Sequence, residues 1–350
     1  MKVLMTHHYF PPDFAGGGEY VALETARGLI KCGVDVRVLT TGDPRITSYE
    51  GISTARIPIH RYGFNLAYRR ILAMAKDVDL IQTYNYHACL PSLAVGKHLH
   101  KPVVCYILGL VRQAWGHLRP PIAASLWSAW EKFLLTRDFS RVIFPSEHAR
   151  DFGLQLGIPP SRLVINCPGI ALEHYGPAQQ KEDIVFFTGR LDGRRGVDNV
   201  LATARKLPHV RFRIMGWGPG EDRLRHSASS NVEFVKFERG EPLRKAFAAA
   251  RIFFLPTRAE SFGIAVVEAM ASGCAVISSA ELPFEGMRIQ GDDPDEMAGA
   301  VTRLWADREE TEEMGRRNIE LAQQYSWDRF TRIMIDTYEQ VLNGDQACQP

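Results

Sequence analysis

Two glutamates separated by seven residues, Glu260 and Glu268, lie in an otherwise apolar segment of the chain (255–279, LPTRAESFGIAVVEAMASGCAVISS). The turn Ser261-Phe262-Gly263 is expected to open a helix, because good helix formers follow it and Gly273 fits the residue after the helix end. One carboxylate therefore precedes the helix, and the other lies about two turns inside it. The free backbone N–H groups of a helix start suit a hydroxyl-rich or anionic ligand. The alternative is an acid on an exposed loop and another on a helix surface.

Two arginines mark a second candidate site, in the loop 189–196 (GRLDGRRG). The loop follows a predicted strand at 184–188 and precedes a predicted helix at 197–207. Arg190 and Arg195 can reach one anion across this loop, and a guanidinium group can grip a phosphate through two parallel hydrogen bonds. Glycines in the loop let backbone N–H groups approach the same anion. The alternative is an exposed basic loop without a ligand.

A third candidate is the glycine run that includes Gly16 and Gly17, in the loop after a predicted strand at 2–6. A helix at 19–30 and a strand at 34–39 follow, so the chain opens with a βαβ unit whose glycine loop lies at the carboxyl end of a strand. Open parallel sheets bind ligands at that end. The spacing is not GxGxxG, so the dinucleotide fingerprint is excluded. The alternative is a flexible loop.

The elements that must position these residues form two successive series of strands and helices. A polar segment at 170–183 is the best linker candidate. The sequence therefore predicts an α/β protein of two Rossmann-like domains that face each other across a cleft. We expect an N-terminal domain over 1–168, a C-terminal domain over 169–326, and a terminal helix over 327–345 that packs back towards the N-terminal domain.

Composition is that of a globular protein: 350 residues, 45% hydrophobic and 23% charged, with a net charge of +2. The charge is uneven, with 19 Lys and Arg against 12 Asp and Glu in residues 1–165, and 23 against 28 in the rest. A basic first half suits an anionic substrate or membrane surface, although surface drift explains it equally well. The six cysteines form no CxxC pair, which indicates buried thiols in a reducing compartment.

Several segments, taken in order, resemble the family 4 glycosyltransferases of the GT-B fold. The segment around Glu260 and Glu268 matches the family's E-x7-E motif, and Gly16 and Gly17 fall on its paired glycines. The matching segments are PTRAESFGIAVVEAMASG, GRLDGRRGVDNVL, YFPPDFAGGGEYV, CPGIALEHYGP and YSWDRF. The resemblance extends over nearly the whole chain.

This resemblance implies the roles of the candidate residues. Arg190 and Arg195 would bind the diphosphate of a nucleotide-activated sugar, and Glu268 would hold the ribose hydroxyls. Glu260, with the backbone of Ser261, Phe262 and Gly263, would hold the hydroxyls of the sugar. Gly216 and the segment 237–239 would lie near the nucleotide, and Gly16 and Gly17 would approach the donor from the N-terminal domain.

The implied activity is that of a retaining hexosyltransferase that acts by front-side displacement. The acceptor would be a hydroxyl of a glycan, a lipid-linked saccharide or a metabolite, as in polysaccharide biosynthesis. We expect no cofactor and no metal, because no DxD-like pair is placed to hold a cation and the two arginines would stabilise the leaving diphosphate. Nucleic acid is not an expected partner.

Two positions depart from the family pattern. Arg195 stands where the family has lysine, and Leu108 stands where it has a histidine near the reacting groups. Either His87 or His117 could supply that imidazole instead. The departure at Leu108 leaves one alternative open, a catalytically silent GT-B partner or binding subunit. A related enzyme alternative is a GT-B nucleotide-sugar epimerase.

The N-terminus lacks the apolar stretch of a secretory signal, and no window approaches a transmembrane helix, so we expect a cytoplasmic protein. The segment 110–141 places tryptophans among basic residues, a combination that suits peripheral contact with the inner face of a membrane. The alternative is that these tryptophans belong to the core. The residues concerned are Trp115, Trp127, Trp130, Arg112, Arg119, Lys132 and Arg137.

Overall fold

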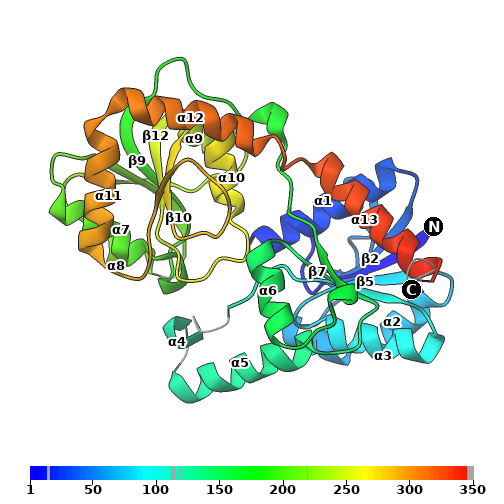
Figure 1. Ribbon diagram of the computed structural model, residues 1–350. Helices are drawn as coiled ribbons and strands as arrows, with labels where there is room; N and C mark the ends of the chain where they lie inside the picture. The colour runs from blue at the N-terminus through cyan, green and yellow to red at the C-terminus, as the bar shows by residue number, and fades with distance from the viewer. Residues whose placement is uncertain (14–15, 112–114, 119, 219, 345–350) are drawn as a thin grey trace. The chain divides into compact units, whose positions relative to one another are not determined.

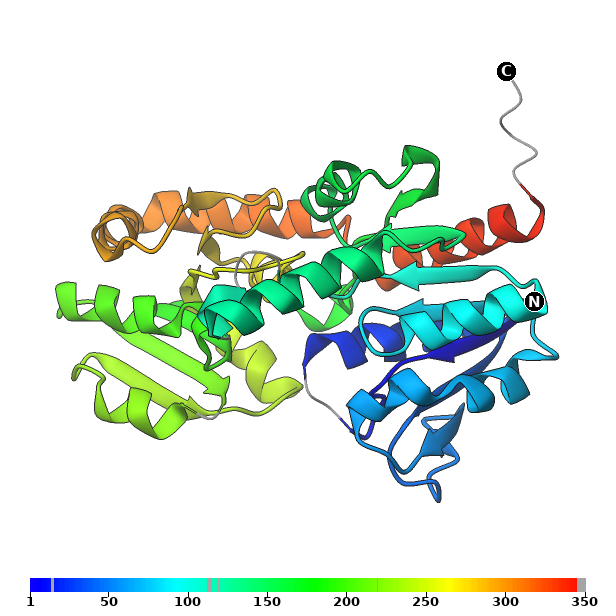
Figure 2. The same ribbon diagram turned by 90° about the horizontal axis from the view of Figure 1, so that it is seen from below.

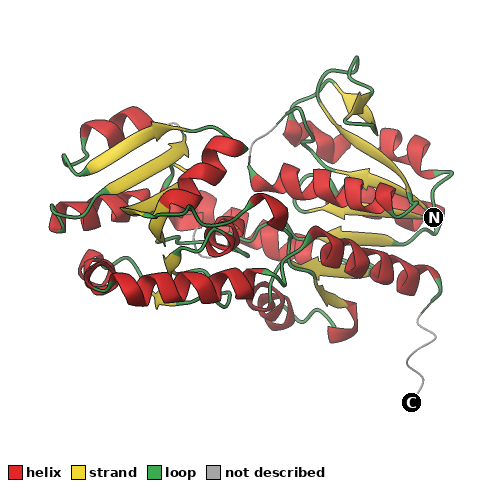
Figure 3. Ribbon diagram, turned by 90° about the horizontal axis from the view of Figure 1, so that it is seen from above, coloured by secondary structure: helices red, strands yellow, loops and turns green. Residues whose placement is uncertain are grey.

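The computed structural model describes residues 1–13, 16–111, 115–118, 120–218 and 220–344, and it divides into two compact units. The N-terminal unit comprises Met1–Leu110, Leu126–Gly169 and the chain from Trp327 onward, and the C-terminal unit comprises Val111–Ser125 and Ile170–Ser326. Helices lie on both faces of a mostly parallel sheet in each unit (Figures 1 and 3). The predicted α/β class with two Rossmann-like domains is confirmed.

The N-terminal sheet has the strand order β3-β4-β2-β1-β5-β6-β7-β8, and every pair except β3–β4 is parallel. The order reverses direction between β1 and β5, which places a topological switch point there. The strands are β1 (Lys2–Thr6), β2 (Asp35–Thr41), β3 (Ser48–Tyr49), β4 (Ile52–Ile57), β5 (Leu80–Tyr84), β6 (Val103–Tyr106), β7 (Arg141–Phe144) and β8 (Leu163–Ile165).

Helices α1 and α13 pack together on one face of this sheet, and α2 and α3 pack together on the other (Figure 1). Tyr338 of α13 donates a hydrogen bond to the Gln82 side chain of β5 (3.0 Å), so the last helix is anchored in the core of this unit. The helical elements are α1 (Gly17–Lys31), η1 (Arg61–Leu66), α2 (Tyr68–Ala75), α3 (Cys89–Leu99), α5 (Pro121–Leu135), α6 (Glu147–Gln155), η3 (Pro160–Arg162) and α13 (Trp327–Leu342).

The C-terminal sheet is parallel throughout, with the order β11-β10-β9-β12-β13-β14. This is the strand order of the Rossmann fold, and its switch point lies between β9 and β12. The strands are β9 (Glu182–Arg190), β10 (Phe212–Trp217), β11 (Val232–Lys236), β12 (Ala250–Leu255), β13 (Ala275–Ser278) and β14 (Gly286–Arg288).

In this unit α7 packs against α11, while α10 packs against α9 and α12. Phe186, Phe247 and Phe253 meet with their ring centroids 5.2–6.1 Å apart in the core between the sheet and α9. The helical elements are α4 (Trp115–Leu118), η4 (Leu172–His174), η5 (Gly193–Arg195), α7 (Val197–Lys206), α8 (Glu221–His226), α9 (Glu241–Ala249), α10 (Ile264–Ala271), α11 (Pro294–Ala306) and α12 (Arg308–Ala322).

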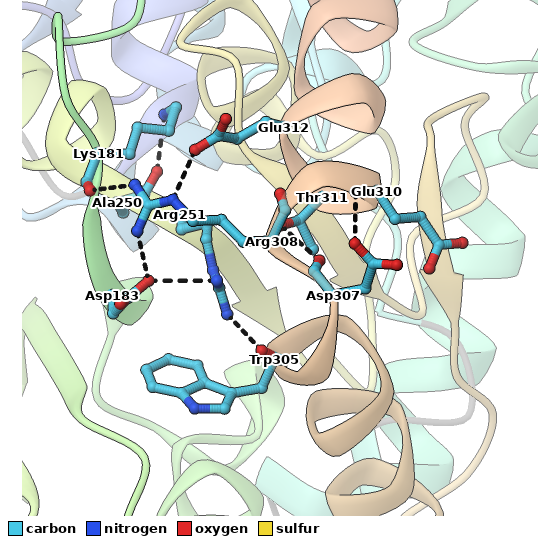
Figure 4. A network of polar contacts seen from close by, with 10 residues as sticks. All are labelled: Lys181, Asp183, Ala250, Arg251, Trp305, Asp307, Arg308, Glu310, Thr311 and Glu312. Atoms are coloured by element: carbon cyan, nitrogen blue, oxygen red, sulfur yellow. Dashed lines mark hydrogen bonds and ion pairs between the residues drawn. The ribbon is translucent and has the colours of Figure 1, made fainter.

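A polar network holds the amino edge of the C-terminal sheet, where β9 and β12 begin (Figure 4). The buried ammonium group of Lys181 donates to the carbonyls of Ala248, Ala250 and Ser272 at 2.7–3.1 Å. Arg251, which is only 3% exposed, contacts Asp183 at 3.2 Å and donates to the Trp305 carbonyl at 2.9 Å. Because these bonds connect β9, β12 and α11, they fix the strands whose opposite ends carry the candidate site.

The segment 111–125 groups with the C-terminal unit, whereas the sequence analysis placed it in the N-terminal domain. The short helix α4 lies beside η5 of the C-terminal unit, which accounts for this grouping. Within the described residues, none of the helices has the length and apolar character that crossing a membrane requires.

Candidate functional site

The predicted donor residues of the C-terminal unit lie on loops at the carboxyl edge of its sheet. Arg190 ends β9, Gly216 lies next to the end of β10, and Glu260 follows β12. Gly189 of β9 pairs in register with Gly216 of β10, so these loops start at the same level. The loops after β9 and β12 flank the switch point, the position at which open parallel sheets bind ligands.

The arginine loop is folded tightly by its own side chains. Asp192 caps η5, because its carboxylate accepts a hydrogen bond from the backbone N–H of Arg195 (3.3 Å), and it also pairs with Arg190 (3.2 Å). Gly196 then takes a left-handed conformation (φ 69°) and leads into α7. A Cβ atom on Gly196 would lie 1.8 Å from the carbonyl oxygen of Pro256, so only glycine fits this contact between the two loops.

Arg195 and Glu260 meet directly. The Arg195 guanidinium donates to Oε2 of Glu260, while Oε1 of Glu260 accepts the backbone N–H of Ser261 (3.1 Å). Both side chains are partly buried, with 24% and 15% exposed. The carboxylate therefore orients one arginine of the predicted phosphate loop, and the remaining N–H groups of Arg195 stay available to a ligand.

Phe262 and Gly263 shape the turn that opens α10. Phe262 is buried, and its ring packs edge-on against Tyr325 (5.4 Å between centroids). Gly263 caps the helix in a left-handed conformation (φ 104°). Because the backbone N–H of Ser261 already donates to Glu260, the predicted contact of this turn's backbone with a ligand stays a prediction.

Glu268 lies inside α10 and forms a hydrogen bond with Tyr175, whose hydroxyl donates to the carboxylate at 2.6 Å. Burial raises the pKa of Glu268 to about 7, against the opposing effects of the Tyr175 hydroxyl and of Arg239. Arg239 in turn lies over the rings of Trp217 and Phe237. Glu268 and the segment 237–239 are therefore neighbours, and their predicted roles at the ribose and near the nucleotide stay predictions.

Arg258 is a residue of this site that the sequence analysis missed. It forms two hydrogen bonds with the carboxylate of Asp198 (2.8 Å each), a third with Asp292 (2.7 Å), and a fourth with the carbonyl of Gly193 (2.6 Å). These bonds raise the pKa of Arg258 above its ordinary value. Its backbone N–H also binds the carbonyl of Arg194 (2.8 Å), so one residue ties the loop after β12 to the loop after β9.

Gly16 and Gly17 lie in the N-terminal unit, at the start of α1 and at the carboxyl edge of that unit's sheet. The backbone N–H of Gly16 donates to the carboxylate of Glu19 (2.8 Å), which caps the helix. The two glycines thus belong to a different unit from the arginine loop, and their predicted approach to the donor stays a prediction.

Leu108 packs where the family pattern has histidine. A Cβ on Gly18 would lie 3.0 Å from Cδ1 of Leu108, so this leucine covers the first turn of α1. Asn85 fixes the backbone there, since its side chain accepts from the N–H of Leu108 (2.9 Å) and donates to the carbonyl of Gly109 (2.7 Å). Of the two candidate substitutes for the histidine, the side chain of His117 lies outside the described part of the chain.

Helix α5, drawn as one continuous blue-green helix in Figure 2, carries exposed apolar side chains other than the predicted tryptophans. Ile122, Leu126 and Phe133 are 81%, 67% and 43% exposed and follow one another at helical spacing. Trp130 instead packs against the core of the N-terminal unit and stacks on Phe133 (5.5 Å). Trp130 therefore follows the alternative interpretation, in which the tryptophans belong to the core, and contact with a membrane stays a prediction. Arg112 and Arg119 lie outside the described residues.

No cluster of three or more histidine, cysteine or acidic side chains suited to holding a metal occurs among the described residues. All five cysteines that the structure describes are free. Burial raises the pKa of the thiols of Cys89, Cys105 and Cys274, which suits packing rather than nucleophilic chemistry.

Comparisons with known proteins identify both units. The model of the family "Glycosyltransferase Family 4" matches residues 15–174, and that of "Glycosyl transferases group 1" matches residues 182–307. A GDP-mannose:cellobiosyl-diphosphopolyprenol alpha-mannosyltransferase of Xanthomonas oryzae pv. oryzae is 27% identical, over 98% of this chain and 97% of that protein.

Two solved structures share the fold over nearly their whole length. Sucrose-phosphate synthase of Thermosynechococcus elongatus superimposes with a TM-score of 0.83 at 19% identity, over 98% of this chain and 99% of that one. HepE of Anabaena, in complex with UDP and glucose, gives a TM-score of 0.78 at 17% identity, over 97% and 99%. At these identities the likeness concerns the fold.

Proposed function

Because the chain belongs to the family 4, group 1 glycosyltransferases, we propose that it moves a hexose from a nucleotide-diphosphate sugar to an acceptor hydroxyl with retention of configuration. The observation that carries this proposal is the joint position of Arg190, Arg195 and Glu260 on the two loops that flank the switch point of the C-terminal sheet. The Anabaena neighbour, whose structure holds UDP and glucose, supports a nucleotide-sugar donor.

Each side chain of the site has a role in this reaction. Arg190 and Arg195 hold the diphosphate, Glu268 accepts hydrogen bonds from the ribose hydroxyls, and Glu260 binds the sugar while it orients Arg195. Gly216 lies near the nucleotide in this proposal; a Cβ there would lie 2.5 Å from the carbonyl oxygen of Gly189, so glycine is needed for the close packing of the loop starts after β9 and β10. Gly16 and Gly17 approach the donor from the N-terminal unit.

The proposed chemical step is a front-side displacement. The bond between the anomeric carbon and the diphosphate oxygen breaks, and the acceptor oxygen forms its bond to that carbon on the same face. The acceptor's proton passes to the departing phosphate oxygen. Two arginines near the leaving group supply the positive charge that would otherwise come from a metal ion, so we propose that transfer needs neither metal nor cofactor.

The acceptor in this proposal is a glycan, a lipid-linked saccharide or a metabolite. The Xanthomonas relative is named for a diphosphopolyprenol-linked acceptor, which favours the second of these. A cytoplasmic protein with peripheral membrane contact is part of the same proposal, and the exposed side chains Ile122, Leu126 and Phe133 support it together with the exposed Lys132. Flotation with anionic liposomes tests this contact, and no binding of the protein at low salt would rule it out.

Donor binding and cleavage test the proposal as a whole. A thermal-shift screen of UDP-, GDP- and dTDP-sugars should show stabilisation by one class, because a ligand that binds only the folded state raises its melting temperature. The same donor should release nucleoside diphosphate slowly without acceptor. Arg190→Ala and Glu260→Ala should each lower the rate of transfer at least 100-fold. Removal of one hydrogen-bond donor from an oxyanion site lowers kcat by roughly 10²–10³. Arg316→Gln, a change on an exposed helix surface, serves as the control.

Leu108 is the observation that favours a second candidate, a catalytically silent partner or binding subunit. Failure of every nucleotide sugar to bind, with no release of nucleoside diphosphate, would support that candidate. Conversion of one nucleotide sugar into its epimer without transfer would instead identify an epimerase.

A further inference from the structure

A cluster of histidines lies at the carboxyl edge of the N-terminal sheet, beside that unit's switch point. We call His7, His8, Arg61, Asn65 and His87 the histidine cluster. His7 and His8 follow β1, His87 follows β5, and the other two belong to η1. Since β1 and β5 are the strands between which the sheet order reverses, the cluster occupies the position at which this kind of sheet binds ligands.

The aromatic rings in and beside the cluster are in contact one after another, from His7 to Tyr62. His7 stacks on His8 (4.6 Å between centroids), and His8 meets His87 edge-on (5.1 Å). Tyr62 packs edge-on against His87 (4.9 Å), and the guanidinium of Arg61 lies over the Tyr62 ring at 4.9 Å. The contacts fix the direction of each side chain, so the cluster is held in place before any ligand binds.

Several polar atoms of the cluster are buried and lack a partner. These atoms are Nε2 of His7, Nδ1 of His8, Nε of Arg61 and Oδ1 of Asn65. His7 is only 1% exposed, so an unmade hydrogen bond there is costly. Four such atoms from two separate segments of one unit, the end of β1 and η1, indicate a place for a polar ligand.

None of the five residues of the cluster carries a negative charge. Within the described part of the chain, no carboxylate lies at ion-pair distance from Arg61. Glu19 is the acid that acts on His7, and its carboxylate is already engaged by the backbone N–H of Gly16. A ligand with several oxygen acceptors and a negative charge would supply what the cluster is missing.

The histidines are neutral in this arrangement, because their positive forms are strongly disfavoured. Burial, followed by the neighbouring His7, His87 and Arg61, lowers the pKa of His8 to about 2. Burial and Arg61 lower the pKa of His87 to about 4. Arg61 is therefore the cation of the cluster at neutral pH. The neutral histidine rings beside it add hydrogen-bond donors and acceptors for a ligand.

We propose that the histidine cluster binds a phosphate group of the acceptor, with Arg61 as its cationic contact and the rings of His8 and His87 as hydrogen-bonding partners. The proposal rests on the transferase function above and adds the chemical class of the acceptor, a phosphate ester. The phosphate ester can be the monoester of a soluble sugar or polyol, or the diphosphate linkage of a lipid-bound saccharide. Both present the oxygen acceptors that the cluster lacks.

Binding of inorganic phosphate tests the cluster without any transfer reaction. The measurement is calorimetric and uses the full chain with its donor loop saturated by nucleoside diphosphate, so that Arg190 and Arg195 are occupied. We expect saturable phosphate binding that weakens at least tenfold in Arg61→Gln. Arg70→Gln, which removes an exposed arginine of α2 outside the cluster, should bind phosphate like the unmodified protein.

Transfer assays then identify the source of the phosphate. A soluble sugar, its phosphate monoester, and a polyprenyl-diphosphate saccharide in vesicles are compared as acceptors. The proposal predicts transfer to one of the two phosphorylated acceptors and a rise of at least tenfold in its KM in both Arg61→Gln and His87→Gln. Equal use of the unphosphorylated sugar, or an unchanged KM in both variants, would overturn it. Absence of donor cleavage in the unmodified protein would instead refute the transferase function, whatever the phosphate binding shows.

Discussion

The hydroxyl of Tyr175 lies 2.6 Å from Oε1 of Glu268 and donates a hydrogen bond to it. Tyr175 belongs to the segment that enters the C-terminal unit, whereas Glu268 lies inside α10, 93 positions further along the chain. The carboxyl group is held in an environment that raises its pKa to about 7, chiefly through burial. The residue predicted to bind the donor's ribose therefore changes its charge within the physiological pH range.

Donor binding should consequently depend on pH. An ionised carboxylate accepts hydrogen bonds from both ribose hydroxyls, whereas the protonated form loses part of that capacity. With a pKa of about 7, the ionised fraction falls about tenfold from pH 8 to pH 6. We expect the donor KM to rise by up to about tenfold over this range, measured as the rate of nucleoside diphosphate release.

Two variants test the assignment to this carboxyl group. Glu268→Gln should have a high donor KM that no longer varies between pH 6 and 8. Tyr175→Phe removes a hydrogen bond that lowers the pKa of Glu268, so its KM profile should move to higher pH. An unchanged pH profile in Glu268→Gln would show that another group controls donor binding.

The same carboxyl group affects stability. Its pKa in the folded protein lies above the ordinary value of 4.5, so the favourable contribution of the protonated form is complete below pH 4.5 and is lost as pH rises through 7. Glu268→Gln has no carboxyl group to ionise, so it does not lose this stability as the pH rises. Between pH 5 and pH 8 we expect the free energy of unfolding of the variant to rise by about 1–2 kcal/mol relative to that of the unmodified protein. This value is smaller than the full pKa shift implies, because the side chain is partly exposed and solvent screens it.

Thermal unfolding at the two pH values measures this effect. The difference in melting temperature between Glu268→Gln and the unmodified protein should be more positive at pH 8 than at pH 5 by about 3 °C. Glu313→Gln, at an exposed carboxylate whose pKa the neighbouring arginines lower, should not become more stabilising at pH 8. A difference that grows towards pH 5 would contradict the assigned direction.

Gly196 controls the contact between the two loops of the site. In Gly196→Ala the new methyl group would collide with the backbone of Pro256, which cannot move aside as a flexible side chain does. We expect a loss of at least about 3 kcal/mol in stability and weaker donor binding. Gly291→Ala provides a matched control, since Gly291 has nearly the same φ (71°) and no heavy atom near the added Cβ.

Melting curves of the two variants separate collision from backbone strain. Gly291→Ala carries only the strain of a left-handed alanine and should lose roughly 1 kcal/mol. Equal losses in the two variants would mean that the collision with Pro256 is relieved by a small movement of the loops.

The sequence predicts which candidate residues lie near one another wherever the sheet topology brings them together. Arg190 and Glu260 each follow a buried parallel strand, and the carboxyl ends of parallel strands meet at one edge of a sheet. Arg258 could not be assigned in the same way. Its partners Asp198 and Asp292 lie 60 and 34 residues away in the chain, so no local pattern links them.

Helix α12 is an element of the fold that the hydrophobic pattern of the sequence does not reveal. Its buried positions are Thr311, Gly315, Asn318 and Ala322, which follow helical spacing but are small or polar. Asn318 is buried because its side chain satisfies backbone groups of Cys274 and Glu285. A hydrophobic stripe is therefore missing, and the periodicity that identifies most helices is absent from this one.

Arg258 should matter for activity through the geometry of the loops rather than through contact with the donor. Its four hydrogen bonds to Asp198, Asp292 and Gly193 depend on the planar fork of a guanidinium group, which lysine cannot reproduce. We expect Arg258→Lys to lose about 1–2 kcal/mol of stability, because lysine keeps the charge but cannot make all four hydrogen bonds, and the exposed carboxylates of Asp198 and Asp292 are partly solvated. Misplacement of Arg195 and Glu260 should lower kcat/KM by about 10–100-fold.

Steady-state kinetics and thermal unfolding, measured on the same preparations, test this role. Arg316→Gln is the control, because Arg316 is 62% exposed and pairs with Glu313 on the surface of α12, where an ion pair is worth roughly 0–1 kcal/mol. The loss of activity in Arg258→Lys should persist at temperatures well below its melting point, since the loops are misplaced in the folded protein. Full activity of Arg258→Lys under those conditions would show that Asp192 and Gly196 position the arginine loop without help from Arg258.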